Sequence, residues 1–500
     1  MSVISNAKST VALCTGFMAL ISMVWGQAPM PASGSAASTG GGTQGAGVGM
    51  MQMTVAPPPA DPAYRGSVPQ GTASSTPIAL TLGEAIDRGL KANLGLLTNI
   101  ESSREVRAER YRALSSLLPS VTGQVGETVQ QLNLQALGFN VSIPGVAVPH
   151  IVGPFSYQAA QANITTPIFN YSSLSNFRAS REDVRASLLS VKNARDLVVQ
   201  AVGNAYLQII ADSARVVATQ AEIEADTAVY TNAVRRHEAG VAIALDVLRS
   251  QVELKQRQQL LVANTNQFEK DKLGLGRIIG LPSGQDFTVA DPAPALPLEA
   301  MPLNEALSTA YEHRPDYQAA KARVIAAEFS LRAAKAERYP TVQAQGYYGD
   351  IGLHLFSNSH GVFQITGSVQ FNIFDAGRIK ADILQNDSEL RNRRNELENL
   401  RGQIDYDVRA ALLDLKSAGD QVDVARSNLQ LANDTLRQSR DRFAAGVTNT
   451  VEVVQAQQAV ADANENVISA QYQYNVAKVS LARGLGIAEE GVKKYFTQKP

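Results

Sequence analysis

The chain of 500 residues has a single cysteine, Cys14, few aromatic residues and almost no net charge. Because Cys14 lies in a short apolar stretch near the N-terminus, the rest of the chain can form neither a disulfide nor a thiol site. A formal net charge of −1 gives no sign of a nucleic-acid partner. No stretch has the ~18 consecutive apolar residues of a transmembrane helix. These absences exclude disulfide-built scaffolds, thiol chemistry and helical membrane proteins.

Sequence signals of catalysis are also missing. The chain has no P-loop and no convincing set of nucleophile and base. The glycines Gly274, Gly276 and Gly280 resemble a dinucleotide-binding loop, but they follow a helical pattern rather than a strand and have the wrong spacing. Metal-ligand spacing such as HExxH is absent among the five histidines, which are His150, His237, His313, His354 and His360. We therefore expect no enzymatic activity, cofactor or metal.

The first 28 residues are predicted to be a secretory signal peptide. Lys8 supplies the positive start, an apolar stretch follows, and Gly26-Gln27-Ala28 forms a small-x-small cleavage site. An uncleaved membrane anchor is the alternative, but about 14 apolar residues are short for a span. Cys14 follows Leu13 rather than a small residue, so we expect no lipid attachment.

Residues 29–77 are predicted to be a disordered linker. They consist mainly of Gly, Ser, Ala, Pro and Met and carry almost no charge, so they cannot bury enough apolar surface to offset the entropy of ordering. Met50, Met51 and Met53 could bind a soft metal such as Cu(I). A nonspecific flexible tail is the favoured alternative.

Two long helices are predicted between Pro167 and Pro282, which enclose a stretch without proline. Apolar residues recur at helical spacing from Val184 to Val234 and again from Leu245 to Ile279, with a break at Gly240. A first arm of roughly 60 residues would be about 90 Å long. A compact globular domain does not contain a helix of this length, so we expect these helices to form an elongated structure.

The second half of the chain repeats the first. Ala85 and Pro119 match Ala306 and Pro340 at a shift of 221 positions, and Gly240 matches Gly446 at a shift of 206. The change of shift falls within the hairpin loops. The sequence therefore predicts a first repeat over residues 78–281, a connector over 282–302 with a short strand at 286–290, a second repeat over 303–487 and a C-terminal tail over 488–500.

Each repeat also contains two runs with strand periodicity. In the second repeat, apolar residues from Phe363 to Ile373 alternate with Gln364, Thr366, Ser368, Gln370 and Asn372, and a partner run starts at Val342. Each run covers about the 9–11 residues that cross a bilayer as a tilted strand. We expect Gln124, Gln345, Gln364 and Gln370 to face a wet lumen, and Val369, Phe371 and Ile373 to face lipid. The alternative is a soluble sheet with one solvated face.

Four strands cannot close into a barrel, and open sheet edges are not tolerated in hydrocarbon. If the strands insert, the chain must therefore oligomerise. At this point the sequence resembles the TolC-type outer-membrane efflux proteins from Leu80 to Gly486. The resemblance rests on several separate fragments, which are Leu82-x-x-Ala85-Ile86 with Leu90 and Asn93, Thr166–Phe169, Asn372–Gly377, the hairpin tips Glu238–Val241 and Arg442–Val447, and the endings Arg277–Pro282 and Leu485-Gly486.

The resemblance implies a mainly helical, duplicated fold that includes a transmembrane β-barrel. Each chain of a homotrimer would supply two β-hairpins to a 12-stranded barrel and long helical hairpins to a 12-helix tube across the periplasm. Such a channel would serve as the passive exit duct of a tripartite efflux or type I secretion system. It would sit in outer-membrane lipid and dock to a periplasmic adaptor and an inner-membrane pump.

The same resemblance implies roles for residues at the hairpin ends. Gly240, Val241, Gly446 and Val447 would contact the adaptor; turn formation alone is the alternative for the glycines.

At the periplasmic mouth, the resemblance implies acidic residues six and nine positions after the second tip glycine, and this chain has Glu452 and Gln455 there. Three Glu452 carboxylates would favour cations in a narrow mouth, unless Glu452 is only a solvated helix charge. Gln455 departs from the pattern. Thr448 replaces a basic residue that would latch the closed state, and Asp246 is a further candidate for bonding between helices.

Two other classes of protein stay open at this stage. A periplasmic coiled-coil scaffold or adaptor that enters no membrane would need the helices and the repeat, but not four amphipathic strands of bilayer length. A purely structural surface protein is the weaker rival, and it would lack channel activity.

Overall fold

The computed structural model describes residues 64, 66–138, 149–291, 298, 301–353, 359–445, 447–448 and 450–497. The predicted signal peptide and the three methionines Met50, Met51 and Met53 lie outside these residues, as does Gly446. Among the described helices, none is both long and apolar enough to cross a membrane.

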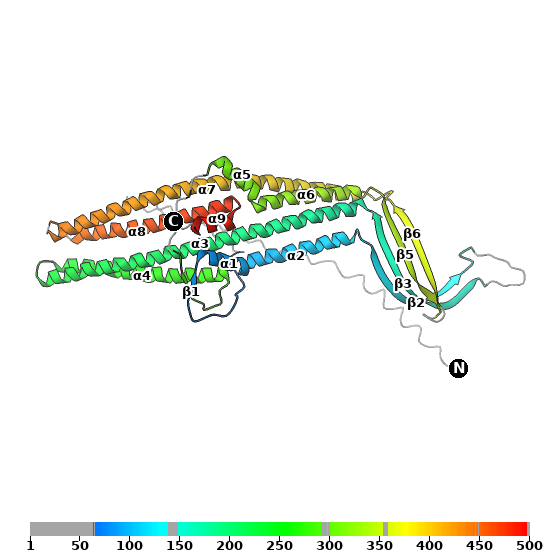
Figure 1. Ribbon diagram of the computed structural model, residues 1–500, viewed down its shortest axis with the longest axis horizontal. Coiled ribbons are helices and arrows are strands. Elements are labelled where there is room, and N and C mark those ends of the chain that lie inside the picture. The colour runs from blue at the N-terminus through cyan, green and yellow to red at the C-terminus, as the bar shows by residue number, and fades with distance from the viewer. Residues whose placement is uncertain are drawn as a thin grey trace, which may run out of the picture. The chain divides into compact units, whose positions relative to one another are not determined.

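Two long helical hairpins dominate the described chain (Figure 1). The first joins α3 (Tyr171–Glu238) to α4 (Ala244–Ile279), and the second joins α7 (Arg378–Ala444) to α8 (Thr450–Gly484). The 68 residues of α3 correspond to roughly 100 Å of helix. The predicted hairpins and the predicted duplication are confirmed. Contacts between α3 and α8 bring the two hairpins side by side.

A pair of shorter helices precedes each sheet hairpin. These are α1 (Leu82–Ala92) and α2 (Leu94–Ser115) in the first repeat, and α5 (Leu303–His313) and α6 (Pro315–Ala336) in the second. The helical spacing of Ala85, Leu90 and Leu97 in the sequence predicts one continuous helix as far as Leu118. This prediction was wrong, because the helix is interrupted at Asn93. The Asn93 side chain accepts a hydrogen bond from the Leu96 amide at 3.4 Å and donates one to the Tyr64 carbonyl at 2.7 Å, so it caps a new helix.

Four long strands form one antiparallel sheet in the order β2-β3-β5-β6. They are β2 (Ser120–Asn133), β3 (Ile151–Phe169), β5 (Thr341–Gly352) and β6 (Ser359–Gln370). The strand predicted to reach Ile373 ends at Gln370, so Phe371 and Ile373 lie in the connection to α7. The sheet has two edges without a partner strand in the described chain, β2 and β6.

A small parallel pair of strands accompanies the helices. β1 (Ile78–Leu80) pairs with β4 (Phe287–Val289), which confirms the strand predicted at 286–290. Tyr206 of α3 donates its hydroxyl to the Leu80 carbonyl at 2.8 Å, so the pair is fixed to the long helix.

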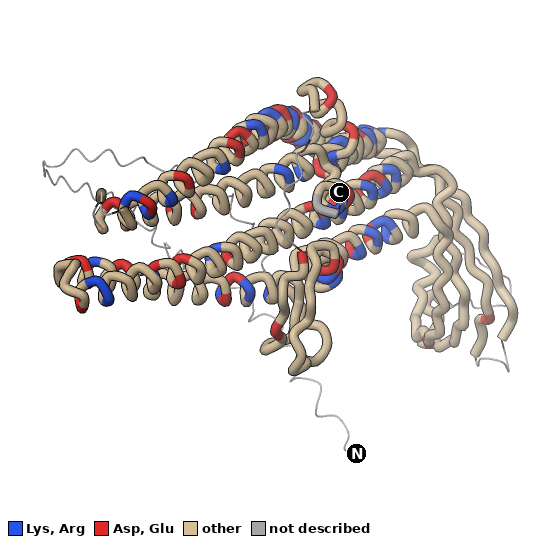
Figure 2. Tube along the Cα trace, turned by 60° about the vertical axis from the view of Figure 1, so that its left-hand side comes forward, with Lys and Arg blue, Asp and Glu red and all other residues tan. Residues whose placement is uncertain are grey.

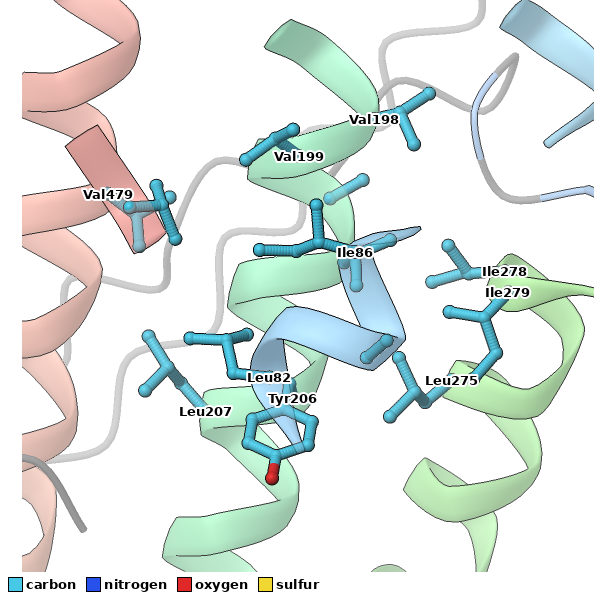
Figure 3. Close-up of a cluster of buried hydrophobic side chains, with 14 of the residues drawn as sticks. Leu82, Ile86, Val198, Val199, Tyr206, Leu207, Leu275, Ile278, Ile279 and Val479 are labelled. Atoms are coloured by element: carbon cyan, nitrogen blue, oxygen red, sulfur yellow. The ribbon is translucent and has the colours of Figure 1, made fainter. Parts of the chain in front are cut away.

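The largest core lies where α1, α3, α4 and α8 meet. Figure 3 shows Ile86 of α1 among side chains of α3 and α4, with Val479 of α8 alongside. A second core joins α5, α7 and α8 around Ile404, Val408 and Leu481. The two cores lie at the middle of α3 and α7 and at the C-terminal ends of α4 and α8, so the hairpin turns project beyond them.

The two chain ends of this body are more ordered than the sequence indicated. Within the segment predicted to be a linker, the Val68 amide donates to the Ala92 carbonyl at 2.9 Å and the Gln70 amide to the Gly280 carbonyl at 3.0 Å. The predicted disorder therefore does not extend to residue 77. The C-terminal tail contains α9 (Ala488–Thr497), whose Ala488 and Val492 are buried in the first core.

Candidate functional site: the hairpin ends and the two faces of the sheet

The first hairpin end is a glycine turn between α3 and α4. Gly240 has φ +73°, a conformation that glycine adopts without steric cost. The Val241 amide donates a hydrogen bond to the Arg236 carbonyl at 2.9 Å. This is the Schellman arrangement of a helix C-terminus. Val241 is 65% exposed and Ile243 is 62% exposed, so the turn presents an apolar surface at its end.

The second hairpin end has the same backbone pattern. The Val447 amide donates to the Arg442 carbonyl at 2.9 Å, five residues back, as Val241 does to Arg236. Val447 is 69% exposed. The structure therefore places both predicted docking valines at exposed hairpin ends, and Gly446 lies outside the described residues.

Glu452 is held inside its own hairpin. Its carboxylate lies 3.3 Å from the Arg442 guanidinium, and it accepts hydrogen bonds from Thr448 and, at 3.4 Å, from Ser439. Thr448 thus contacts the acidic residue directly, although it replaces the basic residue that the resemblance implied. The charge of Glu452 is partly offset by Arg442.

The other two predicted mouth residues lie apart from this cluster. Gln455 is exposed on α8 and borders an apolar groove of about 480 Å³ between the starts of α4 and α8, together with Leu245 and Leu248. Asp246 lies half-buried in the first turn of α4 and is not among the residues that line this groove. One chain alone does not bring Asp246, Glu452 and Gln455 into a single site.

A buried polar cluster between the two hairpins was not predicted from the sequence. Arg257 of α4 is 9% exposed and lies 3.3 Å from Glu222, 3.9 Å from Asp226 and 3.2 Å from Glu253. On the α8 side, Gln457 donates to Asp226 at 3.0 Å.

This cluster borders a cavity of about 360 Å³. Burial, with the neighbouring Glu253 carboxylate, raises the pKa of Asp226 to about 6, while Arg257 and Arg440 act against the rise. The i,i+4 spacing of Glu222 with Asp226, and of Glu253 with Arg257, was the available sequence signal.

A second contact joins the hairpins closer to their ends. The Arg236 guanidinium of α3 lies 4.4 Å from the centre of the Phe443 ring of α7, a cation–π contact. Neither residue was singled out in the sequence. The half-buried Arg236–Phe443 contact thus adds to the ionic contacts between the two hairpins, which include the Arg257 cluster and the Arg215–Glu465 ion pair at 2.9 Å.

The strand register places the four predicted lumen glutamines on one face of the sheet. Gln124 pairs with Gln161, Thr165 pairs with Gln345 and Gln345 pairs with Thr366. Directly paired residues share a face, as do residues an even number of positions apart on one strand. Gln364 and Gln370 therefore lie on the same side as Gln124 and Gln345. We call this side the glutamine face.

The opposite side, the apolar face, exposes large hydrophobic residues. Ile365 is 80% exposed, and the other members range from 45% to 74%; they are Val121, Val125, Val129, Ile164, Tyr348, Phe363 and Val369. Phe371 and Ile373, which follow β6, are 61% and 89% exposed. Two carboxylates, Glu127 and Asp350, interrupt this face in the halves of their strands that lie farther from the helices.

The height of the apolar face fits a bilayer. Val342 and Asp350 are separated by eight positions on β5, which is about 26 Å along a strand at ~3.3 Å per residue. A tilt of about 40° reduces this height to roughly 20 Å, and the apolar band of an outer-membrane barrel is about 25 Å tall. A sheet with one polar uncharged face, one apolar face and two open edges is typical of a segment of a membrane β-barrel.

Comparison with known proteins agrees with this class. Residues 98–281 and 306–487 match the family described as "Outer membrane efflux protein". The chain belongs to the outer membrane efflux protein family. The family consists of transport proteins rather than enzymes, which confirms the resemblance and the class of protein predicted from the sequence. Membership also places the chain in the outer membrane.

Curated relatives are identical to this chain at about a quarter of the aligned positions. The "Probable efflux pump outer membrane protein TtgC" of Pseudomonas putida is 26% identical over 332 residues, covering 62% of this chain and 65% of that protein. The match therefore spans just under two thirds of this relative. The "Multidrug resistance outer membrane protein MdtQ" of Escherichia coli O157:H7 is 26% identical over 366 residues, covering 67% and 74%.

Solved structures support the fold. The Campylobacter jejuni CmeC outer membrane channel has a TM-score of 0.70 at 16% identity and covers 87% of this chain and 95% of its own. The Neisseria gonorrhoeae MtrE outer membrane channel in its open state has a TM-score of 0.69 at 20% identity and covers 87% and 97%. The combination of duplicated helical hairpins and β-hairpins is confirmed as the fold.

Proposed function

We propose that three copies of this chain form an outer-membrane channel that serves as the passive exit duct of a tripartite efflux or type I secretion system. The observation that carries this proposal is the two-sided sheet. Its glutamine face suits a water-filled lumen without fixed charge, and its apolar face suits lipid.

Closure of the barrel requires other copies of the chain. The β2 and β6 edges cannot stay open in hydrocarbon, and each can be satisfied if β6 of one copy pairs with β2 of the next. Three copies give 12 strands. The helical edges support the same arrangement, because α4 and α7 each expose apolar side chains, among them Leu248, Val252, Val262 and Leu273 on α4 and Leu384, Leu413, Val424 and Leu431 on α7.

The hairpin ends are the proposed sites for partners. Val241 and Val447 offer exposed apolar contacts for a periplasmic adaptor, which would connect the duct to an inner-membrane pump. Glu452, with Thr448 and Arg442 around it, is the proposed charged group of the periplasmic mouth. Asp246 and Gln455 would join it only when several copies assemble.

The cargo of this duct is not specified by its own surface. The names of two relatives refer to toluene for a Pseudomonas putida protein and to cations for CusC of Escherichia coli O157:H7. Amide and hydroxyl groups on the glutamine face would not select cargo by charge, so selection is assigned to the pump.

Arginine substitutions at two adjacent residues of β6 test the orientation of the sheet. Ile365→Arg places a cation on the apolar face, where it costs about 2–4 kcal/mol near the middle of a bilayer, so the variant should insert poorly and give few channels in planar bilayers. Gln364→Arg places the same cation on the glutamine face, and it should insert normally and shift ion selectivity toward anions. Equal insertion of the two variants would contradict the proposed orientation, and a wild-type protein without conductance would contradict the channel itself.

A further inference from the structure

The charged residues of the described chain are distributed unevenly next to the sheet. The four long strands contain only two charged residues, Glu127 and Asp350, whereas the helix segments beside them are rich in Lys and Arg (Figure 2). Arg178 and Arg181 lie in the first three turns of α3, and Arg332 and Lys335 lie in the last turns of α6. All four are exposed, and none forms an ion pair within the part of the chain that the structure describes.

These four cations share one side of the helical layer. On α3, Arg178 and Arg181 are three residues apart, whereas Ser190 is 12 positions from Arg178, which turns it about 120° away. Ser190 accepts a hydrogen bond from Arg323 of α6 at 2.9 Å. Arg323 precedes Arg332 by nine positions, or about half a turn around the helix. Ser190 and Arg323 both line a cavity on one side of the layer, so Arg178, Arg181 and Arg332 lie toward the other side. Lys335 follows Arg332 by three positions and lies on that side too.

The side that carries the cations also exposes apolar residues. Leu188 follows Arg181 by seven positions and is 41% exposed, and Ile325 precedes Arg332 by seven positions and is 37% exposed. Seven positions are close to two full turns, so these residues lie in line with the cations. The opposite side presents the polar groups Ser190 and Asn193 at a cavity of about 190 Å³, and the charged residues that also line it are opposite in sign, Arg323 and Arg393 against Asp316 and Glu396. Apolar and cationic residues together suit the exterior next to lipid, and polar groups suit the lumen.

The helix dipole explains only part of this pattern. Lys335 and Arg332 lie at a helix C-terminus, where cations are stabilising. Arg178 and Arg181 lie near the N-terminal end of α3, which has no acidic residue in its first turn, so the dipole gives no reason for cations there. A partner outside the chain accounts for both pairs.

The depth of the cations identifies that partner. Arg178 is seven residues from the start of α3 and Arg332 four residues from the end of α6, which corresponds to about 10 Å and 6 Å of helix. At the junction between the strands and these helices, Ile168, Tyr339, Phe371 and Phe374 are 55% to 89% exposed. Aromatic residues at such a level mark the boundary of a bilayer, and lipid headgroups lie just beyond it.

We infer that Arg178, Arg181, Arg332 and Lys335 form a basic collar that binds the anionic headgroups of phospholipids in the inner leaflet of the outer membrane. This inference rests on the proposed insertion of the sheet. The collar holds the barrel at a fixed depth, because its cations stay in the headgroup layer while Phe371 and Phe374 stay in the apolar boundary. Each cation should raise the association constant for an anionic surface roughly fivefold at low salt. This attraction weakens as salt is added.

Lipid selectivity of the full mature protein, reconstituted in bilayers, tests the collar. Spin-labelled phosphatidylglycerol and spin-labelled phosphatidylcholine are compared for association with the wild type and with the triple variant Arg178→Gln/Arg181→Gln/Arg332→Gln. Lys335 is retained because it stabilises the end of α6. A matched variant, Lys270→Gln/Lys416→Gln/Arg426→Gln, removes the same number of exposed cations from α4 and α7 away from the sheet.

The wild type and the matched variant should prefer phosphatidylglycerol severalfold at low salt and less at high salt, and the triple variant should lose most of this preference. Equal association of the wild type with both lipids, or an unchanged preference in the triple variant, would overturn the collar. So would a loss of binding to purified peptidoglycan in the triple variant with lipid selectivity intact. In each case normal conductance would leave the proposed channel standing, whereas a wild type that does not conduct would reject the channel instead.

Discussion

The buried Asp226 makes the packing of the two hairpins dependent on pH. Its pKa is raised to about 6, first by burial and then by the Glu253 carboxylate, whereas an aspartate in an unfolded chain has a pKa of about 3.9. A group whose pKa is higher in the folded state contributes stability that is fully present below the unfolded value and is lost as the pH rises through the folded value. Asp226 therefore supports packing below about pH 4 and opposes it above about pH 6.

The substitution Asp226→Asn isolates this effect. A difference of about two pKa units corresponds to at most on the order of 3 kcal/mol, and Asp226 is 5% exposed, so little of this is lost to solvent screening. The asparagine oxygen can still accept the hydrogen bond from Gln457. At about pH 7.5 the variant should unfold at a higher temperature than the wild type, and at about pH 4 the two should differ little.

The measurement is thermal unfolding followed by helical circular dichroism at both pH values. A buried carboxyl outside this cluster whose pKa is raised, such as Asp212, is shared by both proteins and largely cancels in the comparison. Asp420→Asn, an exposed site on α7, is the control and should change the unfolding temperature little at either pH. A variant that is less stable than the wild type at about pH 7.5, or equally stable, would refute the assignment of Asp226.

Three further predictions concern the hairpin ends and the turns. Glu452→Gln should reduce the cation preference of single channels, and Arg442→Gln should increase it because Arg442 offsets the Glu452 charge; unchanged selectivity in both would reject Glu452 as a mouth residue. Val241→Asp and Val447→Asp should impair efflux in cells while cross-linked trimers form normally, and normal efflux would count against docking at these ends. Gly240→Ala should lower the free energy of unfolding by about 1–2 kcal/mol because of the positive φ alone, since a Cβ at this position would have no atom within 4 Å. Gly486→Ala, whose Cβ would lie 2.6 Å from the Arg314 amide nitrogen, should prevent folding, and similar thermal stabilities of the two glycine variants would contradict this reasoning.

The main architecture could be predicted because its long helices, its four long strands and its repeat each have a periodic signal. Helical spacing, strand alternation and the repeat shift are properties of the chain alone, and the glutamine face follows directly from alternation. The break at Asn93 was missed because apolar spacing continues across it and the cap is made by one side chain. The second repeat held the missing signal. At the shift of 221, Asn93 corresponds to Arg314, which is followed by Pro315 at the start of α6.

The mouth and the inter-hairpin contacts were harder to predict for a physical reason. The contacts of Arg257 join residues of α3, α4 and α8, and their geometry depends on how two hairpins pack rather than on local spacing. The partner of Glu452 was also missed, because Arg442 lies on the other side of a turn. Similarly, the order of residues 66–70 depends on hydrogen bonds to Ala92 and Gly280, which composition does not reveal.

The unpaired edges of β2 and β6 have a consequence for biogenesis. If the proposed channel forms, each polypeptide that has not yet paired with other copies carries two rows of free backbone donors and acceptors beside a broad apolar surface. These are the features that drive aggregation. The proposed channel would therefore depend on capture by chaperones and on rapid assembly as much as on its final structure. An edge substitution that leaves the completed duct intact can still lower its abundance in the cell.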